Sequence, residues 1–290
     1  MKLIFYISLV ILLTLTSCTE DITTSWLKID TIQLNTNTTT EGENSHNITD
    51  AWVFMDNQPL GVWEIPCEIP ILAEGKHSFV VYAGIKSNGI NASRIKYPFY
   101  KTHDFDLTLV EGETISYTPT VSYKSNKIII GREDFEDIGI ILNPNTDFDT
   151  SKIRIVSIAN YPTIVKYGTN CGKITLTQND TLVQVFTNSN LDLEKGKVFM
   201  ELDYYNSNSF AVGLNSVSVT NGNSYNEPFI AIPSQNNSDI TWKHIYLDLT
   251  TYVSNVDQAV NFEFYIVSAL DADKTNSFVY LDNIKIVQFD

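Results

Sequence analysis

Basic residues are scarce in this chain of 290 residues, which holds 19 lysines and arginines against 34 aspartates and glutamates. The formal net charge is −15. A chain this acidic is repelled by phosphate backbones, so the composition argues against nucleic acid as a partner. It is compatible with cations or neutral polymers as ligands.

Histidine is also scarce, and the motifs of several large enzyme classes are missing. There is no Gly-x-Ser-x-Gly elbow, no histidine pair at zinc-binding spacing and no phosphate-binding loop. A histidine-based catalytic centre has few candidates, because the sequence contains only His46, His77, His103 and His244. We therefore expect a protein that is not an enzyme.

Long apolar runs are missing too, apart from one near the N-terminus. Lys2 precedes an apolar stretch, Leu3 to Leu15, that is short for a membrane-spanning helix. The order of charge, apolar run and small residues is that of a secretory signal peptide. The quartet Leu15-Thr16-Ser17-Cys18 resembles the bacterial lipobox, in which cleavage precedes a cysteine that receives acyl chains.

The lipobox resemblance implies a signal peptide at residues 1–17, covalent lipid such as palmitate on Cys18, and a membrane-anchored tether at residues 18–26. An ordinary signal peptide is the alternative. Glu20 and Asp21 close behind Cys18 resemble the acidic export signal of surface lipoproteins in Bacteroidota. This implies an outer-membrane lipoprotein, and whether its domains face the periplasm or the cell surface stays open.

Two cysteines remain after lipidation, Cys67 and Cys171. An oxidising compartment would allow a disulfide between them. They fall in different expected domains, so two free thiols are favoured.

Helical periodicity is almost absent, and short runs of alternating apolar and polar residues recur between clusters of Gly, Asn and Pro. This pattern is typical of an all-β chain of sandwiches. The length suits two domains, and the polar cluster Ser122–Lys127 places them at 27–123 and 124–290. The polar stretch Asn35–Asn47 is expected to be an exposed, mobile loop.

The first domain centres on a strand at Ala51–Met55, a turn and a second strand that follows EGKH. Its pattern resembles the PEGA-type surface-layer module, with Asn57 where that module has glycine. The resemblance implies a small, immunoglobulin-like β-sandwich that presents or spaces other parts. His77 is expected to cap the turn. The matching positions are Asp56, Gly61, Pro66, Gly75 and His77.

The second domain opens with EDFEDIG and closes with SFVYLDNIKIVQFD. This order resembles jelly-roll carbohydrate-binding modules and their galactose-binding-like relatives, which implies two antiparallel sheets. Many such modules hold a structural Ca²⁺ where the first and last strands meet, and Glu136 and Asp282 match its ligands best. The alternative is that both are solvated acids at strand ends.

Two strands of the second domain should carry aromatic and acidic side chains on one face. In KVFMELDYYN the alternation points Val198, Met200, Leu202 and Tyr204 toward the core, and in TWKHIYLDLT it does the same for Ile245, Leu247 and Leu249. Phe199 and His244 point outward, on the same face as the candidate glycan-binding residues. Flat rings suit the apolar faces of sugars and carboxylates suit hydroxyls. The alternative is that a loop or the first domain covers Trp242 and Tyr246. The predicted glycan-binding residues are Glu201, Asp203, Tyr205, Trp242, Tyr246 and Asp248.

The stretch ELDYYN resembles the Glu-x-Asp-x-x-Glu strand of laminarinase-type glycosidases, in which two glutamates flank the scissile bond. Here Asn206 takes the last position, and an amide cannot protonate a leaving group. The substitution argues against catalysis by this strand.

These features predict a lipid-anchored envelope protein, not an enzyme, whose jelly roll binds a polysaccharide or another glycan. The rival interpretation is a structural lipoprotein that docks on protein partners of an envelope secretion, motility or uptake complex.

Overall fold

The computed structural model describes residues 23–144, 153–187, 190–218, 224–236, 238–256 and 260–290. Cys18 and the expected signal peptide lie outside the described residues. The regular secondary structure of the described chain is nearly all β-strand, which confirms the predicted fold class. Its helices α2 (Thr38–Glu41) and α3 (Thr250–Asn255) are short. In the part of the chain that is described, no helix is long and apolar enough to cross a membrane.

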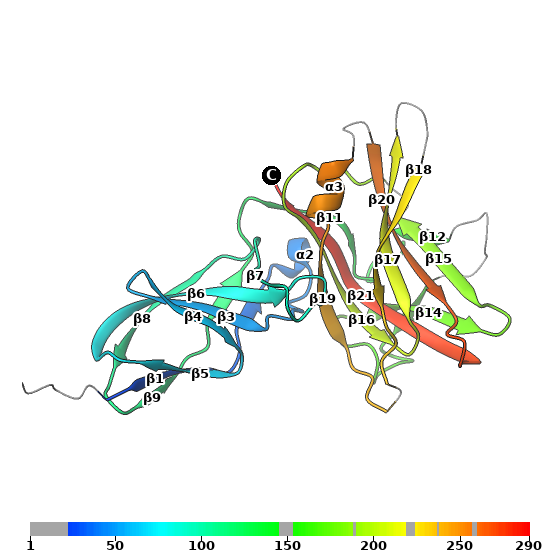
Figure 1. Ribbon diagram of the computed structural model, residues 1–290. Coiled ribbons are helices and arrows are strands. Elements are labelled where there is room, and N and C mark those ends of the chain that lie inside the picture. Colours follow the sequence, from blue (N-terminus) through cyan, green and yellow to red (C-terminus); the bar gives the residue numbers. More distant parts are fainter. Residues whose placement is uncertain (1–22, 145–152, 188–189, 219–223, 237, 257–259) are drawn as a thin grey trace, which may run out of the picture.

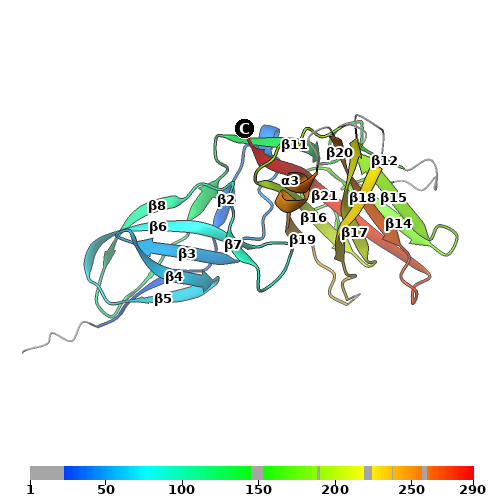
Figure 2. The same ribbon diagram turned by 45° about the horizontal axis from the view of Figure 1, so that its top comes forward.

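The first domain contains β1 to β10 in three sheets. One has the order β5-β1-β9, a second pairs β10 with β2, and the largest has the order β4-β3-β6-β7, with β8 also on β6 (Figure 2). The first strand starts inside the stretch expected as a tether. The strands are β1 (Ser25–Ile29), β2 (Gln33–Asn35), β3 (Asp50–Met55), β4 (Gln58–Glu64), β5 (Cys67–Ile71), β6 (Gly75–Lys86), β7 (Arg94–Lys96), β8 (His103–Leu109), β9 (Thr114–Ser116) and β10 (Thr120–Ser122).

The hairpin between β3 and β4 turns at Asp56 and Asn57, whose φ angles are 48° and 66°. Aspartate and asparagine adopt this left-handed backbone more readily than other non-glycine residues. His77 Nδ1 lies 2.6 Å from the Asp56 carboxylate and His77 Nε2 lies 3.0 Å from the Glu74 carbonyl oxygen. His77 therefore braces the turn, as the sequence predicts.

The second domain is a sandwich of two antiparallel sheets. One has the order β13-β14-β21-β16-β19, with β11 also on β21, and the other has the order β12-β15-β20-β17-β18. The strands are β11 (Lys127–Glu133), β12 (Leu142–Pro144), β13 (Arg154–Ser157), β14 (Asn170–Thr177), β15 (Leu182–Thr187), β16 (Val198–Asn206), β17 (Phe210–Ser218), β18 (Ser224–Ile232), β19 (Lys243–Asp248), β20 (Val260–Ala269) and β21 (Asn276–Phe289).

The last strand, β21, ties the six-stranded sheet together. It pairs with β16 along one side and with β14 and then β11 along the other. Val198, Met200 and Leu202 of β16 and Ile245 and Leu247 of β19 are buried in the core between the two sheets. The alternation predicted for these two strands is thus confirmed.

The six-stranded sheet lies between the second sheet and the first domain (Figure 1). Phe199, Tyr246 and Val287 point away from the core of their own sandwich and belong to the hydrophobic core of the first domain. The ring of Phe199 packs against Tyr97 and Phe99, with centroid distances of 5.4 and 6.1 Å. The two domains therefore share one apolar interior at their junction.

The polar segment, residues 36–49, is part of this junction. The expectation of an exposed loop at Asn35–Asn47 is confirmed only in part. Residues 37–40 are exposed, but α2 forms there and Glu41 and Ser45 are buried. Asn37 Oδ1 accepts from the Thr39 amide, and Glu41 Oε2 accepts from the Asn37 amide at 2.8 Å. These reciprocal bonds cap the helix. The polar composition of this segment predicts a mobile loop, but its contacts with the rest of the protein give it a fixed structure.

Cys67 lies on β5 and Cys171 on β14, and both are free thiols. Burial raises the pKa of the Cys171 thiol to about 12. A thiol that stays protonated is a poor nucleophile, so Cys171 is a packing residue.

We expect Phe199→Ala to destabilise the protein by ~3–5 kcal/mol, because it removes a fully buried ring from the junction of the domains. Urea unfolding followed by tryptophan fluorescence measures this loss. Val62→Ala, at a side chain that is 44% exposed, is the matched control and should change the free energy of unfolding by less than ~0.5 kcal/mol. If both variants lost the same small amount of unfolding free energy, the two domains would not share a core at Phe199.

Candidate functional site

The face of the six-stranded sheet that is turned away from its own sandwich core is called the outer face here. It carries the side chains predicted to contact sugar. The first domain covers one half of this face. The other half, called the open half below, is covered in part by the loop that carries Tyr161, Ile164 and Val165. Across neighbouring strands the partners are Glu201 with Tyr246 and Asp203 with His244.

Glu201 lies in the covered half and has no solvent exposure. Its carboxylate accepts hydrogen bonds from the hydroxyls of Tyr97 and Tyr123, the latter at 2.7 Å, and both tyrosines belong to the first domain. Lys285 Nζ lies 3.6 Å from Glu201 Oε2. A buried carboxylate requires such partners, so Glu201 holds the two domains together and presents no surface to a polymer.

Asp203 is buried beside Glu201. Its carboxylate accepts from Ser45 Oγ at 2.6 Å and from Asn283 Nδ2 at 2.8 Å, and lies 2.7 Å from His244 Nδ1. Burial alone would raise the pKa of Asp203, but His244 and these hydrogen bonds bring it below its usual value. Asp203 therefore stays ionised and fixes the polar segment to the sheet.

Tyr246 and Asp248 lie at the end of β19 that faces the first domain. Tyr246 is buried, and its hydroxyl lies 3.1 Å from that of Tyr100. The Asp248 amide donates to Asn88 Oδ1, and its carboxylate accepts from the Thr250 amide. The structure thus places Glu201, Asp203 and Tyr246 under the first domain and Asp248 at its margin, apart from Tyr205 and Trp242.

The open half carries a strip of three half-buried rings, Trp242, Tyr205 and Phe278, named the aromatic strip below. The ring of Tyr205 lies 5.9 Å from each of the other two, centroid to centroid, and is nearly parallel to that of Phe278. Trp242 Nε1 donates to the carbonyl of Ile164 at 2.7 Å, which fixes the indole. Tyr205 lies on β16, Phe278 on the neighbouring β21, and Trp242 directly before β19. Two of these three rings, Tyr205 and Trp242, were predicted from sequence.

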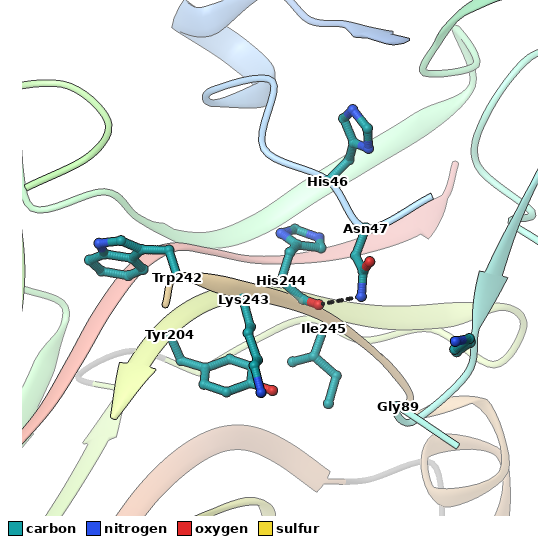
Figure 3. Close-up of a pocket in the computed structure, with 9 residues that line it drawn as sticks. His46, Asn47, Gly89, Tyr204, Trp242, Lys243, His244 and Ile245 are labelled. Atoms are coloured by element: carbon teal, nitrogen blue, oxygen red, sulfur yellow. Dashed lines mark hydrogen bonds between the residues drawn. The ribbon is translucent and has the colours of Figure 1, made fainter. Parts of the chain in front are cut away.

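A pocket of about 270 Å³ opens beside Trp242, between the two domains (Figure 3). Asn47 Nδ2 donates to the His244 carbonyl at 3.1 Å and fastens the polar segment to β19. Burial, helped by the charges of His244 and Lys166, lowers the pKa of His46 to about 4, so His46 is neutral at pH 7. The lining residues are His46, Asn47, Lys86 and Gly89 from the first domain and Tyr204, Trp242, Lys243, His244 and Ile245 from the second.

The two residues expected to ligate calcium lie in different surroundings. Asp282 is buried, and its Oδ2 has no hydrogen-bond partner among the described residues. Burial, helped by nearby carboxylates, raises the pKa of Asp282 well above its usual value. Both oxygens of Glu136, by contrast, accept from Thr169 and Asn170, including amide bonds of 2.7 and 2.8 Å.

These surroundings fit a cation in part. Asp282 offers an orphaned oxygen that a cation would satisfy, whereas Glu136 is already held by protein donors. No group of three His, Cys, Asp or Glu side chains within the described ranges is arranged to hold a metal. Calcium here would depend on Asp282, with backbone carbonyls supplying most of the remaining oxygens.

The other sheet has an outward face that the sequence analysis did not single out. The ring of Tyr265 lies directly over Gly213, where an added Cβ would sit 2.1 Å from Tyr265 Cζ. Phe186 packs against Tyr265 at 5.4 Å, and Asn215 Nδ2 donates to Glu263 at 3.1 Å. The alternation in NFEFYIVSAL, with Glu263 and Tyr265 pointing outward, is the signal that could have found this second face.

No protein-family model matches this chain, and no curated protein matches it. Among solved structures, the chain is similar to a carbohydrate-binding module specific for non-crystalline cellulose, with 16% identity, a TM-score of 0.38, and coverage of 52% of this chain and 89% of that one. It is also similar to the C-terminal family 22 carbohydrate-binding module of Clostridium thermocellum Xyn10B, with 12% identity, a TM-score of 0.39, and coverage of 56% of this chain and 95% of that one. A third similar structure is the K2 cleaved adhesin domain of Lys-gingipain, with 11% identity, a TM-score of 0.39, and coverage of 56% of this chain and 98% of that one. These similarities are too low to assign a ligand.

Proposed function

We propose that this protein is a non-catalytic, lipid-anchored envelope protein that binds carbohydrate along the aromatic strip. The observation that carries the proposal is a set of three half-buried rings fixed by their neighbours. The planes of Tyr205 and Phe278 are nearly parallel, and that of Trp242, just before β19, is tilted by 44° from Tyr205. Rings at this spacing offer consecutive flat surfaces to the apolar faces of a saccharide chain.

The rigidity of the strip supports binding without a large ordering cost. Trp242 is held by its bond to Ile164, and Tyr205 packs over Tyr280, which is buried on the same face. Side chains that are already immobile lose little conformational entropy when a ligand arrives. The rival proposal, an assembly lipoprotein that docks on protein partners, calls for a large exposed apolar patch. The exposed large apolar residues among those described are divided between the two domains: Val62, Leu72, Ile90 and Val110 in the first, and Ile128, Ile138, Ile158 and Leu182 in the second.

We expect Trp242→Ala and Tyr205→Ala each to weaken polysaccharide binding about five- to thirtyfold, because loss of one stacked ring removes ~1–2 kcal/mol of contact. Affinity electrophoresis against a polysaccharide panel, followed by calorimetry with the best ligand, measures the change. Thermal melts confirm that the variants are folded.

Two further variants locate the site. Tyr82→Ala removes a half-buried ring from the first domain and should leave binding unchanged. Phe186→Ala truncates the second face. If Phe186→Ala abolishes binding while Trp242→Ala does not, carbohydrate binds the second face instead. If the wild-type protein binds no polysaccharide, the proposed function fails.

We also propose that Asp282 contributes to a structural calcium site. Calcium at millimolar concentration should then raise the melting temperature of the chelator-treated protein by a few degrees, because a ligand that binds the native state alone stabilises it. Asp282→Asn should abolish this shift, whereas Asp106→Asn, in the first domain, should retain it. An equal calcium shift in both variants would exclude Asp282 as a ligand.

The lipid anchor and the outer-membrane location are proposals that depend on Cys18. In a bacterial host that processes lipoproteins, the wild-type chain should fractionate with membranes and require detergent for release. Cys18→Ala should appear in the soluble fraction, and Cys67→Ala should remain with the membranes. Protease added to intact cells then distinguishes the two faces, since only a surface-displayed protein is cleaved.

A further inference from the structure

The pocket between the domains has a charge opposite to that of the chain as a whole. Of its nine lining residues, two are lysines, two are histidines and none is acidic, although acids outnumber lysines and arginines 34 to 19 in the sequence. Lys166 adds a further positive charge nearby, because it is one of the groups that lower the pKa of His46. The lining thus contains no acid, and its positive charge comes from the two lysines, of which Lys86 is paired with Glu64 at 3.3 Å.

Acids also pair with residues that line the pocket. Glu64 pairs with Lys86 at 3.3 Å and also with Arg94, and Asp203 lies beneath His244. The Lys243 ammonium is exposed and makes no ion pair with a described residue. His244 Nε2 is buried and has no hydrogen-bond partner within the described residues. Lys243 is thus available to a ligand.

The net charge of −15 does not cancel this local effect. Exposed charges more than about 8 Å away are largely screened at physiological ionic strength. A group inside the pocket interacts first with the lysines that line it. Long-range repulsion slows the approach of a polyanion, but the contact energy is set within the pocket.

The pocket and the aromatic strip share Trp242. Figure 3 shows Lys243 with Tyr204 and Ile245 on one side of β19, and Trp242 and His244 on the other. A saccharide chain stacked on the strip would therefore place an adjoining unit near Lys243 only where it passes Trp242 and turns round the edge of β19. The volume of the pocket, about 270 Å³, is near the lower end of small-molecule sites. Such a space suits one sugar unit rather than a longer oligomer.

We infer that the pocket recognises a negatively charged sugar unit, bearing a carboxylate or a sulfate ester, through Lys243 and Lys86. This inference rests on the proposed glycan binding and names its ligand class. Lys86 comes from the first domain and Lys243 from the second, so recognition of the charge requires both domains. Neutral chains would contact the aromatic strip alone.

The test compares polymers that differ only in charge. Polygalacturonate is measured against its fully methyl-esterified form, and a sulfated galactan against its desulfated form, by calorimetry with the full protein. We expect at least one charged polymer to bind tenfold or more tightly than its uncharged counterpart, and the two pairs distinguish carboxylate from sulfate.

Lysine variants connect that preference to the pocket. Lys243→Gln and Lys86→Gln should each reduce the preference at least threefold while leaving affinity for the uncharged polymer unchanged, and Lys243→Arg should retain it. Lys76→Gln is the matched control, since Lys76 is an exposed lysine of the first domain that pairs with Asp106.

Each remaining result overturns the inference. Equal affinity for charged and uncharged polymers, or a preference that survives both glutamine variants, would reject charge recognition by the pocket and leave glycan binding intact. Failure of the wild-type protein to bind any of the four polymers would reject glycan binding of this class and the charge preference together.

Discussion

The arrangement of the two domains depends on the burial of the Glu201 carboxylate. A buried carboxylate without partners would destabilise the protein by several kcal/mol, and the groups that satisfy Glu201 come largely from outside its own sandwich. Tyr97 and Tyr123 donate to it from the first domain, and Lys285 lies beside it on β21. The first domain therefore cannot shift along the sheet without leaving this charge unpaired. A purely apolar junction would tolerate several registers, whereas these directional bonds favour one.

The same junction protects an edge strand. β19 ends the six-stranded sheet, and an unpaired edge is a template for association with another chain. Ser87 forms a parallel bridge with Tyr246, the Asn88 amide donates to the Tyr246 carbonyl, and Asn47 caps the His244 carbonyl. Much of the edge of β19 is thus covered by the first domain. The pocket lies where this cover ends, which explains why both domains line it.

The all-β architecture and the two faces of β16 and β19 could be predicted from sequence, because a period of two is a local property of the chain. Val198 and Met200 lie in the core and Phe199 and Glu201 outside it, as the alternation requires. The sequence could not reveal what covers the outward face. That depends on contacts such as Tyr97 with Glu201, which are 104 residues apart.

The polar segment is the clearest case of a tertiary contact that overrides composition. Residues 36–49 are polar enough to resemble a mobile loop, yet Ser45 and Glu41 are buried. Ser45 contacts a carboxylate of the second domain, and Glu41 contacts ammonium groups of the second domain. Ser45 donates to Asp203, and Glu41 pairs with Lys127 and offers its carbonyl to Lys285. Polar residues in such a segment satisfy buried charges, which an apolar segment could not do.

Covering half of the outer face also changes the charge that a ligand meets. In an isolated jelly roll, Glu201 and Asp203 would stand beside the aromatic strip, and the open face would be acidic. The first domain buries both carboxylates and contributes Lys86, which is paired with Glu64, to the pocket that Lys243 also lines. The accessible remainder is therefore aromatic and basic, although neither sandwich alone has that character. Docking of the first domain sets ligand preference by removing acids from the surface as much as by adding lysine to it.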